Sequence, residues 1–407
     1  MSTDEHVIIV GGGLAGARAA EGAREAGYEG RITLVAGEDA LPYVRPPLSK
    51  GFLAGDDDRA SIDVQPAEWY DEHRVALLRG IRATALEPAA RRLRLDDGRT
   101  LDYDRLLLAT GASPRRWRAP DGELDGVHVL RTVGDSERLR AALEPGGRRV
   151  VSVGAGWIGL EVTAAARGYG NEVAVVAPEA VPLSAAVGEV VGGVFAELHR
   201  ANGVELRMST GVAGFRSEGG RVTGVELETG ELLPADLVVV GIGAVPETGL
   251  AEAAGLEVEN GIVTDASFRT SAEGVYAVGD VASVLHPFTG THLRTEHWAN
   301  ALNAGLAAGR AIGGATVAYD ELPYFYTDQY DLGMEYSGFG TLAAGIDPVI
   351  RGDLAGREFL AFWVAEQRVV AGMNVNIWDV NDTLRGLIGR VVPPGRLADP
   401  DVPLTEL

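Results

Sequence analysis

The chain has 407 residues, of which 46% are hydrophobic, and a formal net charge of −22 at pH 7. This length allows roughly three domains, and the acidic excess argues against nucleic acid or an anionic membrane as a partner. The absence of cysteine excludes disulfides, thiolate nucleophiles and cysteine-bound metal sites. No apolar run reaches the ~20 residues that span a bilayer, and the polar N-terminus shows no secretory signal. We therefore expect a cytoplasmic protein.

The first predicted elements form a dinucleotide-binding unit. A strand at Val7–Val10 leads into the sequence GGGLAG at 11–16 and a helix at Ala15–Ala26. G-x-G-x-x-G predicts a dinucleotide site when it follows a strand and opens a helix. In that position the helix N-terminus and the closely approaching backbone can bind a pyrophosphate. After a strand at Ile32–Val35, Glu38 stands about 20 residues beyond Gly16, where an acid meets a ribose hydroxyl.

Several further elements follow before the motif recurs. The loop PYVRPPLSK at 42–50 carries two cations, and residues 79–100 alternate as a small β-meander. A strand at Asp104–Leu108 then ends in three small residues that permit a close backbone approach: Ala109, Thr110 and Gly111.

The second fingerprint repeats the first. A strand at Val150–Val153 enters GAGWIG at 154–159, and a strand at Val173–Val176 follows. A meander at 211–232 and a strand at Leu237–Gly241 then lead to Gly243. Two such motifs predict two dinucleotides and electron transfer between them.

The last part of the chain completes the expected architecture. A strand from Gly274 places Gly279 and Asp280 at its carboxyl end, where open α/β sheets bind ligands. From about Tyr319 the pattern becomes α+β, with strands at Glu358–Val364 and Arg368–Val375 and a proline-rich tail after Pro393 that we expect to be mobile or docked as extended chain. We predict an α/β fold with two Rossmann-like domains and a C-terminal α+β interface domain. The predicted boundaries are 1–115 with 245–320, 116–244 and 321–407.

Several motifs in this order resemble one known family. They are GGGLAG, PYVRPPLSK, LLLATGASPR, LRTVGD, GAGWIGLE, GVYAVGDVAS, RTEHW and PYFYTDQYD. The chain resembles the FAD-dependent NAD(P)H:ferredoxin reductases of the putidaredoxin, rubredoxin and biphenyl-dioxygenase type, which are related to apoptosis-inducing factor. The disulfide reductases that share this fold need a redox cysteine pair, so their chemistry is excluded.

The resemblance implies which residues hold non-covalent FAD. Gly11, Gly13, Ala15 and Gly16 would bind its pyrophosphate and Glu38 its adenosine ribose, with Arg45 and Lys50 along the flavin side. The other implied FAD residues are Ala83, Ala109, Thr110, Gly111, Arg131, Gly279, Asp280 and Trp298. The NAD(P)H set would be Gly154, Gly156, Trp157, Ile158, Gly159, Glu161, Glu179 and Gly243.

The resemblance also implies a catalytic set of Lys50, Glu161 and Trp298. In the family such a glutamate approaches flavin N5 and pairs with the lysine of the PPLSK loop, and Trp298 stands beside the isoalloxazine ring. A fixed cation would stabilise the negative charge that hydride transfer builds on the flavin. A purely structural ion pair is the alternative.

The nucleotide end of the second fingerprint departs from the family pattern. Where NADH-using relatives usually have glutamate, this chain has Ala177, and Ala185 lies in the stretch where they often have arginine. Glu179 is a candidate substitute, and the lack of an arginine for a 2′-phosphate favours NADH over NADPH.

We therefore expect an FAD-dependent oxidoreductase that passes electrons from NADH to a ferredoxin-type iron–sulfur protein serving a cytochrome P450 or dioxygenase. It would be a monomer or homodimer. The alternatives are a redox-gated flavoprotein like apoptosis-inducing factor and a flavoenzyme that acts directly on a small molecule with weakened NAD(P)H binding.

Overall fold

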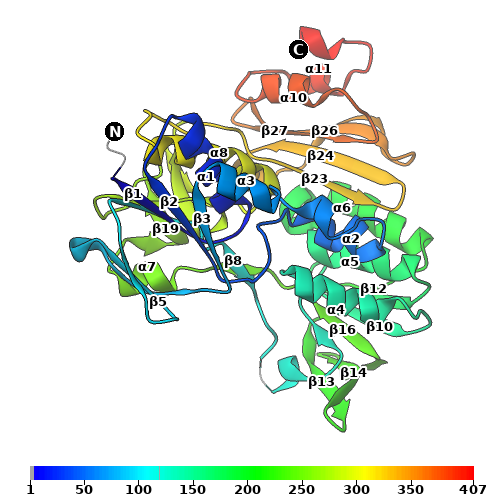
Figure 1. The fold of residues 1–407 in the computed structure, drawn as a ribbon. Coiled ribbons are helices and arrows are strands. Elements are labelled where there is room, and N and C mark those ends of the chain that lie inside the picture. Colours follow the sequence, from blue (N-terminus) through cyan, green and yellow to red (C-terminus); the bar gives the residue numbers. More distant parts are fainter. Residues whose placement is uncertain (1–3, 119) are drawn as a thin grey trace. The chain divides into compact units, whose positions relative to one another are not determined.

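The computed structural model describes residues 4–118 and 120–407, and its contacts divide them into two compact units (Figure 1). Unit 1 comprises Met1–Arg45, Arg59–Ser113 and Ala244–Pro323. Unit 2 comprises Pro46–Asp58, Pro114–Gly243 and Tyr324–Leu407. The predicted nicotinamide-nucleotide and C-terminal domains thus fall largely within one unit, together with the short segment that carries Lys50.

Unit 1 is built on a five-stranded parallel sheet that begins with the first predicted strand. Its apolar runs are buried on both faces, as parallel strands require: Val7, Ile8 and Ile9 are fully buried. In spatial order the strands are β20 (Val275–Ala277), β7 (Arg105–Leu108), β1 (His6–Val10), β2 (Arg31–Ala36) and β3 (Val75–Arg79).

Two helices far apart in sequence pack tightly in unit 1. Helix α1 (Leu14–Glu25) follows β1, and α8 (Trp298–Ile312) lies beside it. A Cβ on Gly22 would stand 2.2 Å from the Leu306 carbonyl oxygen, and one on Gly309 would stand 2.1 Å from that of Ala19. Only glycine permits this approach of the two backbones.

The rest of unit 1 consists of short strands, mostly in antiparallel pairs, and short helices. They are β4 (Ala83–Glu87), β5 (Arg92–Leu95), β6 (Thr100–Asp102), β8 (Ala112–Pro114), β17 (Ala244–Pro246), β18 (Val258–Glu259), β19 (Gly261–Thr264), β21 (Ala282–His286), β22 (Thr291–Leu293), α3 (Ala67–Glu72), α7 (Gly249–Ala253) and 3-10 helices at Ala60–Ile62, Pro88–Ala90 and Gly279–Val281.

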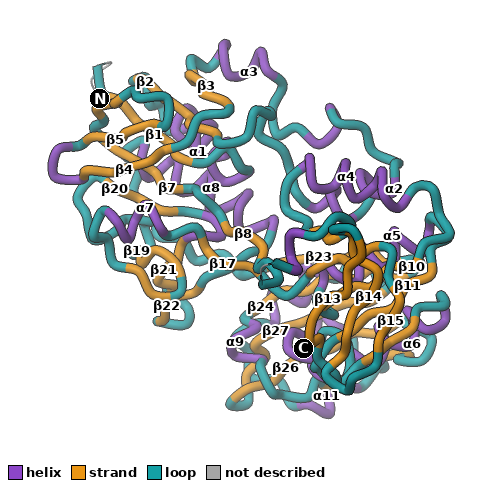
Figure 2. Tube along the Cα trace, turned by 90° about the horizontal axis from the view of Figure 1, so that it is seen from below, coloured by secondary structure: helices purple, strands orange, loops and turns teal. Residues whose placement is uncertain are grey.

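Unit 2 contains a second five-stranded parallel sheet. Its order is β12 (Glu205–Arg207), β11 (Glu172–Val176), β10 (Arg149–Val153), β16 (Leu237–Val240) and β9 (Val127–His128). Its helices are α4 (Val133–Leu143), α5 (Trp157–Gly168) and α6 (Ser184–Ala201), with a 3-10 turn at Asp121–Glu123. Figure 2 shows the neighbouring meander of β13 (Val212–Glu218), β14 (Arg221–Leu227) and β15 (Leu232–Pro234).

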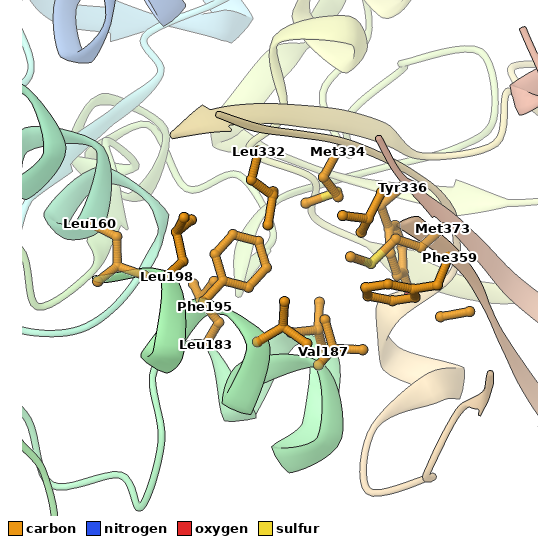
Figure 3. Packing of buried hydrophobic residues seen from close by; sticks show 14 of the residues in the cluster. Leu160, Leu183, Val187, Phe195, Leu198, Leu332, Met334, Tyr336, Phe359 and Met373 are labelled. Atoms are coloured by element: carbon orange, nitrogen blue, oxygen red, sulfur yellow. The ribbon is translucent and has the colours of Figure 1, made fainter. Parts of the chain in front are cut away.

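An antiparallel C-terminal sheet shares a core with α6. Its order is β23 (Tyr324–Gln329), β24 (Leu332–Gly338), β27 (Arg368–Val375), β26 (Glu358–Ala365) and β25 (Val349–Asp353). In Figure 3 the ring of Phe195 from α6 lies among Leu198, Leu332 and Val187. This continuous apolar cluster explains why the predicted nicotinamide-nucleotide and C-terminal domains both lie in unit 2.

The segment Pro46–Asp58 is fixed to unit 2 by its backbone. It holds a 3-10 turn (Pro46–Ser49) and α2 (Gly51–Ala54). The Ser136 hydroxyl donates to the Leu48 carbonyl at 2.8 Å, and the Tyr169 hydroxyl donates to the Leu53 carbonyl at 2.8 Å. The lysine between them therefore has a well-defined backbone position.

The tail after Pro393 is docked, as one of the two expectations had it, but it is neither mobile nor an extended chain. After α9 (Gly340–Ala343) and α10 (Asn381–Leu387), the chain forms α11 (Pro394–Ala398) and a 3-10 turn at Leu404–Glu406. Leu397 is fully buried in a cluster with Leu360 and Leu384. The Arg351 guanidinium donates to the carbonyls of Pro400 and Val402, so apolar burial and backbone hydrogen bonds together dock the tail.

Candidate functional site

The first glycine turn has the backbone geometry that a dinucleotide needs. Gly11 has φ +126°, and its N–H donates to the Val35 carbonyl at 2.8 Å. A Cβ on Gly11 would stand 2.0 Å from the Ala109 carbonyl oxygen, and a Cβ on Gly16 would stand 2.0 Å from that of Gly11. These two glycines are therefore required by close packing of turn, strand and helix.

Gly13 plays a different part in the same turn. It is the N-cap of α1 in extended conformation, and no side chain of the described residues caps the helix there. A Cβ on Gly13 would have no atom of the described residues within 4 Å. The first backbone N–H groups of a helix, among them that of Ala15, have no partner within the helix, so this N-terminus fits the pyrophosphate of FAD.

Glu38 follows β2, and two side chains donate hydrogen bonds to its carboxylate. The Tyr43 hydroxyl donates to one carboxylate oxygen at 2.6 Å, and the Arg45 guanidinium donates to the other at 3.4 Å. Arg45 also lies 5.3 Å from the Tyr43 ring centroid. The structure therefore brings Arg45 to the predicted ribose residue, and Tyr43 was missed because its spacing of five residues from Glu38 matches no motif.

The remaining predicted FAD residues of unit 1 lie near the carboxyl end of its sheet or beyond. Thr110 donates to the Glu247 carbonyl at 2.8 Å, and Gly111 accepts from the Glu247 N–H at 2.9 Å. Gly279 (φ +78°) and Asp280 follow β20. Trp298 is the half-buried first residue of α8, and Ala83 begins β4. Arg131 instead belongs to unit 2, where its N–H donates to Asp135 at 3.2 Å.

The second glycine turn in unit 2 reproduces the first closely. Gly154 has φ +103°, and a Cβ there would stand 2.3 Å from the Gly241 carbonyl oxygen. A Cβ on Gly159 would stand 2.7 Å from the Gly154 carbonyl oxygen. Gly156 precedes α5, and a Cβ added there would have no atom of the described residues within 4 Å. The turn therefore has the form of a second dinucleotide site.

The residues around this second turn differ in exposure. Trp157 packs against Phe325 with ring centroids 5.0 Å apart, and Ile158 is 47% exposed. Gly243 lies exposed after β16, and its carbonyl accepts from the Arg115 N–H at 2.8 Å. The exposed Ile158 and Gly243 remain open to a ligand.

The burial of Ala177 explains why this position, after β11 in unit 2, carries no acid. Ala177 is 1% exposed and packs in the apolar cluster with Leu183 and Val187. Ala185, in the first turn of α6, is exposed. Glu179 is also exposed, and its carbonyl accepts from the Ser209 N–H at 2.8 Å. An acid suits the Glu179 position, where a carboxylate stays in water, better than the buried Ala177 position.

Lys50 and Glu161 form the predicted ion pair within unit 2. Glu161 lies on α5 and is 5% exposed. Lys50 directly precedes α2, and its Nζ forms a salt bridge with the Glu161 Oε1. The Ser49 hydroxyl donates to Oε2 at 2.5 Å and the Thr327 hydroxyl to Oε1 at 2.6 Å. Neither hydroxyl was predicted, because only the folded chain brings them to the carboxylate.

The surroundings of this ion pair are partly desolvated. The Lys50 Nζ lies 5.5 Å from the centroid of the Tyr326 ring. Burial raises the pKa of Tyr326, with smaller contributions from the charges of Asp328 and Glu161. Burial also raises the pKa of Asp328, against the opposing effect of Lys50. An ammonium group held in this way can stabilise negative charge in its neighbourhood.

Residues 4–118 and 120–407 include no helix with the length and apolar character of a membrane span. The same residues contain no group of three or more histidine and acidic side chains able to hold a metal ion.

Comparison with known proteins places the chain in a family. Residues 5–305 match the pyridine nucleotide-disulphide oxidoreductase model, and residues 324–407 match the reductase C-terminal model. The chain belongs to this family of oxidoreductases. Having no cysteine, it belongs to the part of the family that does not use a redox disulfide.

Similar proteins place it further among the ferredoxin reductases. It is 42% identical to the ferredoxin–NAD(+) reductase component of the anthranilate 1,2-dioxygenase system of Burkholderia cepacia, covering 99% of each chain. It is 38% identical to rhodocoxin reductase of Rhodococcus erythropolis, covering 98% of this chain and 93% of that protein. The crystal structure of a covalent putidaredoxin reductase–putidaredoxin complex matches with a TM-score of 0.95 and 37% identity, over 100% and 98% of the chains. The predicted fold, the oxidoreductase class and the FAD and nicotinamide cofactors are confirmed.

Proposed function

We propose that this protein oxidises NADH and supplies single electrons to a small ferredoxin-type iron–sulfur protein, which in turn serves a cytochrome P450 or a dioxygenase. The names of similar proteins include both kinds of system. When bound, FAD supplies the chemistry by accepting a hydride and releasing electrons one at a time. The protein holds and orients both nucleotides.

The residues that would hold FAD lie mainly in unit 1. Gly11, Gly13 and Gly16 shape the turn, and the N-terminus of α1 receives the pyrophosphate. Glu38, oriented by Tyr43 and Arg45, binds the adenosine ribose. The residues proposed to complete the site are Ala15, Ala83, Ala109, Thr110, Gly111, Arg131, Gly279, Asp280 and Trp298.

The residues that would hold NADH lie in unit 2. The turn Gly154–Gly159 receives the pyrophosphate, with Trp157, Ile158 and Gly243 beside it. Glu179 replaces the usual acid at the adenosine ribose, because its side chain is exposed whereas Ala177 is buried. We propose NADH as the preferred donor.

The observation that carries the proposed chemistry is the Lys50–Glu161 ion pair with its two hydroxyl donors. A buried ion pair is weak evidence for stability, because desolvating both charges is costly. A lysine fixed beside a neutralising carboxylate is instead suited to a flavin that becomes negatively charged during reduction. We propose that Lys50 stabilises this charge and that Trp298 flanks the flavin.

Anaerobic stopped-flow reduction tests the function directly. The purified holoprotein is mixed with NADH or NADPH while flavin absorbance is followed, and a [2Fe–2S] ferredoxin is then added. We expect fast bleaching by NADH, slower bleaching by NADPH and rapid reoxidation by ferredoxin. Bleaching by neither nucleotide at millimolar concentration would sink the proposal and favour a flavoenzyme acting directly on a small molecule.

A second outcome would favour the redox-gated alternative. Slow reduction, followed by a long-lived complex of reduced flavin and nucleotide and a change in oligomeric state, would point to a protein like apoptosis-inducing factor. Gel filtration of the oxidised and NADH-reduced holoprotein makes this distinction. A monomer or homodimer whose mass is independent of redox state is expected for the reductase, together with a cytoplasmic location.

A further inference from the structure

A row of buried polar side chains continues from Glu161 into the interior of unit 2. Thr327 and Gln329 lie on β23, and His199 lies near the end of α6. Thr327 and His199 are fully buried, and Gln329 is 1% exposed. Residues two apart on a strand point to the same face, so the sequence Thr-Asp-Gln sends both hydrogen-bonding side chains inward and turns Asp328 to the opposite face.

These side chains form consecutive hydrogen bonds. The Thr327 hydroxyl lies 2.6 Å from Glu161 Oε1, and Gln329 Nε2 lies 3.2 Å from Thr327 Oγ1. The next link joins His199 Nε2 to Gln329 Oε1 at 2.8 Å. At the far end, the hydroxyl of Tyr330 lies 3.5 Å from His199 Nδ1, and Tyr330 is 36% exposed. The row thus runs from the carboxylate toward the surface.

Elementary hydrogen-bond chemistry fixes the direction of every bond in the row. An ionised carboxylate only accepts, so Thr327 must donate to Glu161. The Thr327 oxygen then accepts from the Gln329 amide, which turns the Gln329 carbonyl toward His199. A carbonyl also only accepts, and His199 must therefore carry its proton on Nε2.

The protonation of His199 agrees with this direction. Burial lowers the pKa of His199, and the hydrogen bond to Gln329 opposes this effect only in part. A neutral imidazole has one proton, and with that proton on Nε2 its Nδ1 is an acceptor for the Tyr330 hydroxyl. All donors in the row consequently point toward Glu161.

We propose that Thr327, Gln329 and His199 are positioning residues that hold the Glu161 carboxylate in the orientation in which it pairs with Lys50. This inference rests on the proposed function of the ion pair. Thr327 acts directly on the carboxylate, Gln329 fixes the Thr327 hydroxyl, and His199 fixes the Gln329 amide. A fully connected network of hydrogen bonds restricts the orientation of the carboxylate at its end.

The variant that tests the proposal is Thr327→Val, which removes the hydroxyl and keeps the shape. We expect flavin reduction at saturating NADH to slow about tenfold, the size expected from losing one hydrogen bond to a charged group, with unchanged NADH affinity. Thr327→Ser should recover the rate to within about twofold, because it restores the donor. The matched control is Thr264→Val, since Thr264 is also buried but its hydroxyl has no hydrogen-bond partner among the described residues.

A spectroscopic readout follows the row without relying on turnover. In the ¹⁵N-histidine-labelled holoprotein, with His199→Gln used for assignment, we expect the His199 ring to be the Nε2–H tautomer. In Thr327→Val the Gln329 amide is free to turn, so a mixture of tautomers is expected. A wild-type Nδ1–H tautomer, or no change in Thr327→Val, would overturn the assigned direction.

Glu161→Gln separates failure of this inference from failure of the proposed function. If Glu161→Gln leaves flavin reduction unchanged, the role of the Lys50–Glu161 pair is wrong, and the positioning role falls with it. If Glu161→Gln slows reduction but Thr327→Val does not, the pair keeps its function and only the positioning inference is overturned.

Discussion

The two glycine turns have nearly the same backbone geometry, but the acids that follow them are held differently. In unit 1, Glu38 is bonded by Tyr43 and Arg45. In unit 2, Ala177 stands buried after the corresponding strand, and Glu179 is exposed. A pyrophosphate is bound by backbone groups, which both units supply, whereas an adenosine ribose depends on side chains. The comparison predicts tight FAD binding and weaker binding of the nicotinamide nucleotide.

The largest expected effect comes from filling the open space at the matching glycines. Gly13 (φ −85°) and Gly156 (φ −82°) have extended backbones that valine adopts, and no atom of the described residues lies within 4 Å of either added Cβ. Gly13→Val should yield folded protein without FAD. Gly156→Val should keep FAD and lose reduction by NADH. Flavin absorbance after gel filtration and stopped-flow reduction measure the two outcomes.

A valine elsewhere provides the control for these variants. Gly249, at the start of α7, likewise has no atom of the described residues within 4 Å of an added Cβ. Gly249→Val should retain FAD and normal reduction. If Gly13→Val retains FAD, the turn at 11–16 is not where the pyrophosphate binds.

Removing the two acids is expected to have smaller and unequal effects. Glu38→Ala should weaken FAD binding by about 10- to 100-fold, the range for a hydrogen bond to a charged group. Glu179→Ala should raise the Kd for NADH by only about threefold, because an exposed side chain is screened by water. Isothermal titration of apoprotein with FAD, and of holoprotein with NADH, gives both values. Equal losses of FAD affinity in Glu38→Ala and of NADH affinity in Glu179→Ala would contradict the proposal that the two ribose sites differ.

A further expected effect concerns acid stability rather than ligand binding. Burial lowers the pKa of His297, next to Trp298 in unit 1, to about 4. Because the folded pKa lies below the unfolded value, His297 contributes full stability above about pH 6.5 and loses it as the pH falls toward 4. The loss at pH 5 should be about 2 kcal/mol.

A pair of melting curves measures this contribution. Between pH 7.5 and pH 5, the Tm of the wild-type holoprotein should fall by a few degrees more than the Tm of the His297→Gln variant. An equal fall in both proteins would show that His297 is not kept neutral by burial.

The local part of this structure could be read from the sequence, and the tertiary part could not. The run Val7–Val10 and the following glycines predicted β1, the turn and α1 to within a few residues, because apolar periodicity and glycine spacing are local properties. The family resemblance paired Lys50 with Glu161 correctly. Tyr43 and Thr327 were missed, since their spacing from the acids that they contact carries no motif.

The C-terminal region shows why such contacts escape prediction. The composition of the tail after Pro393 left open whether it is mobile or docked, and the burial of Leu397 and the hydrogen bonds from Arg351 dock it. The roles of individual site residues remain predictions that the variants above test.

The pairing of α1 with α8 sets a constraint on how the chain matures during synthesis. Helix α1 is complete at Glu25, but its partner begins at Trp298. A ribosome adding about 5–20 residues per second needs roughly 15 to 55 seconds to make the intervening chain. During that time the glycine-lined face of α1 has no partner, so unit 1 can close only after nearly three quarters of the polypeptide has been made.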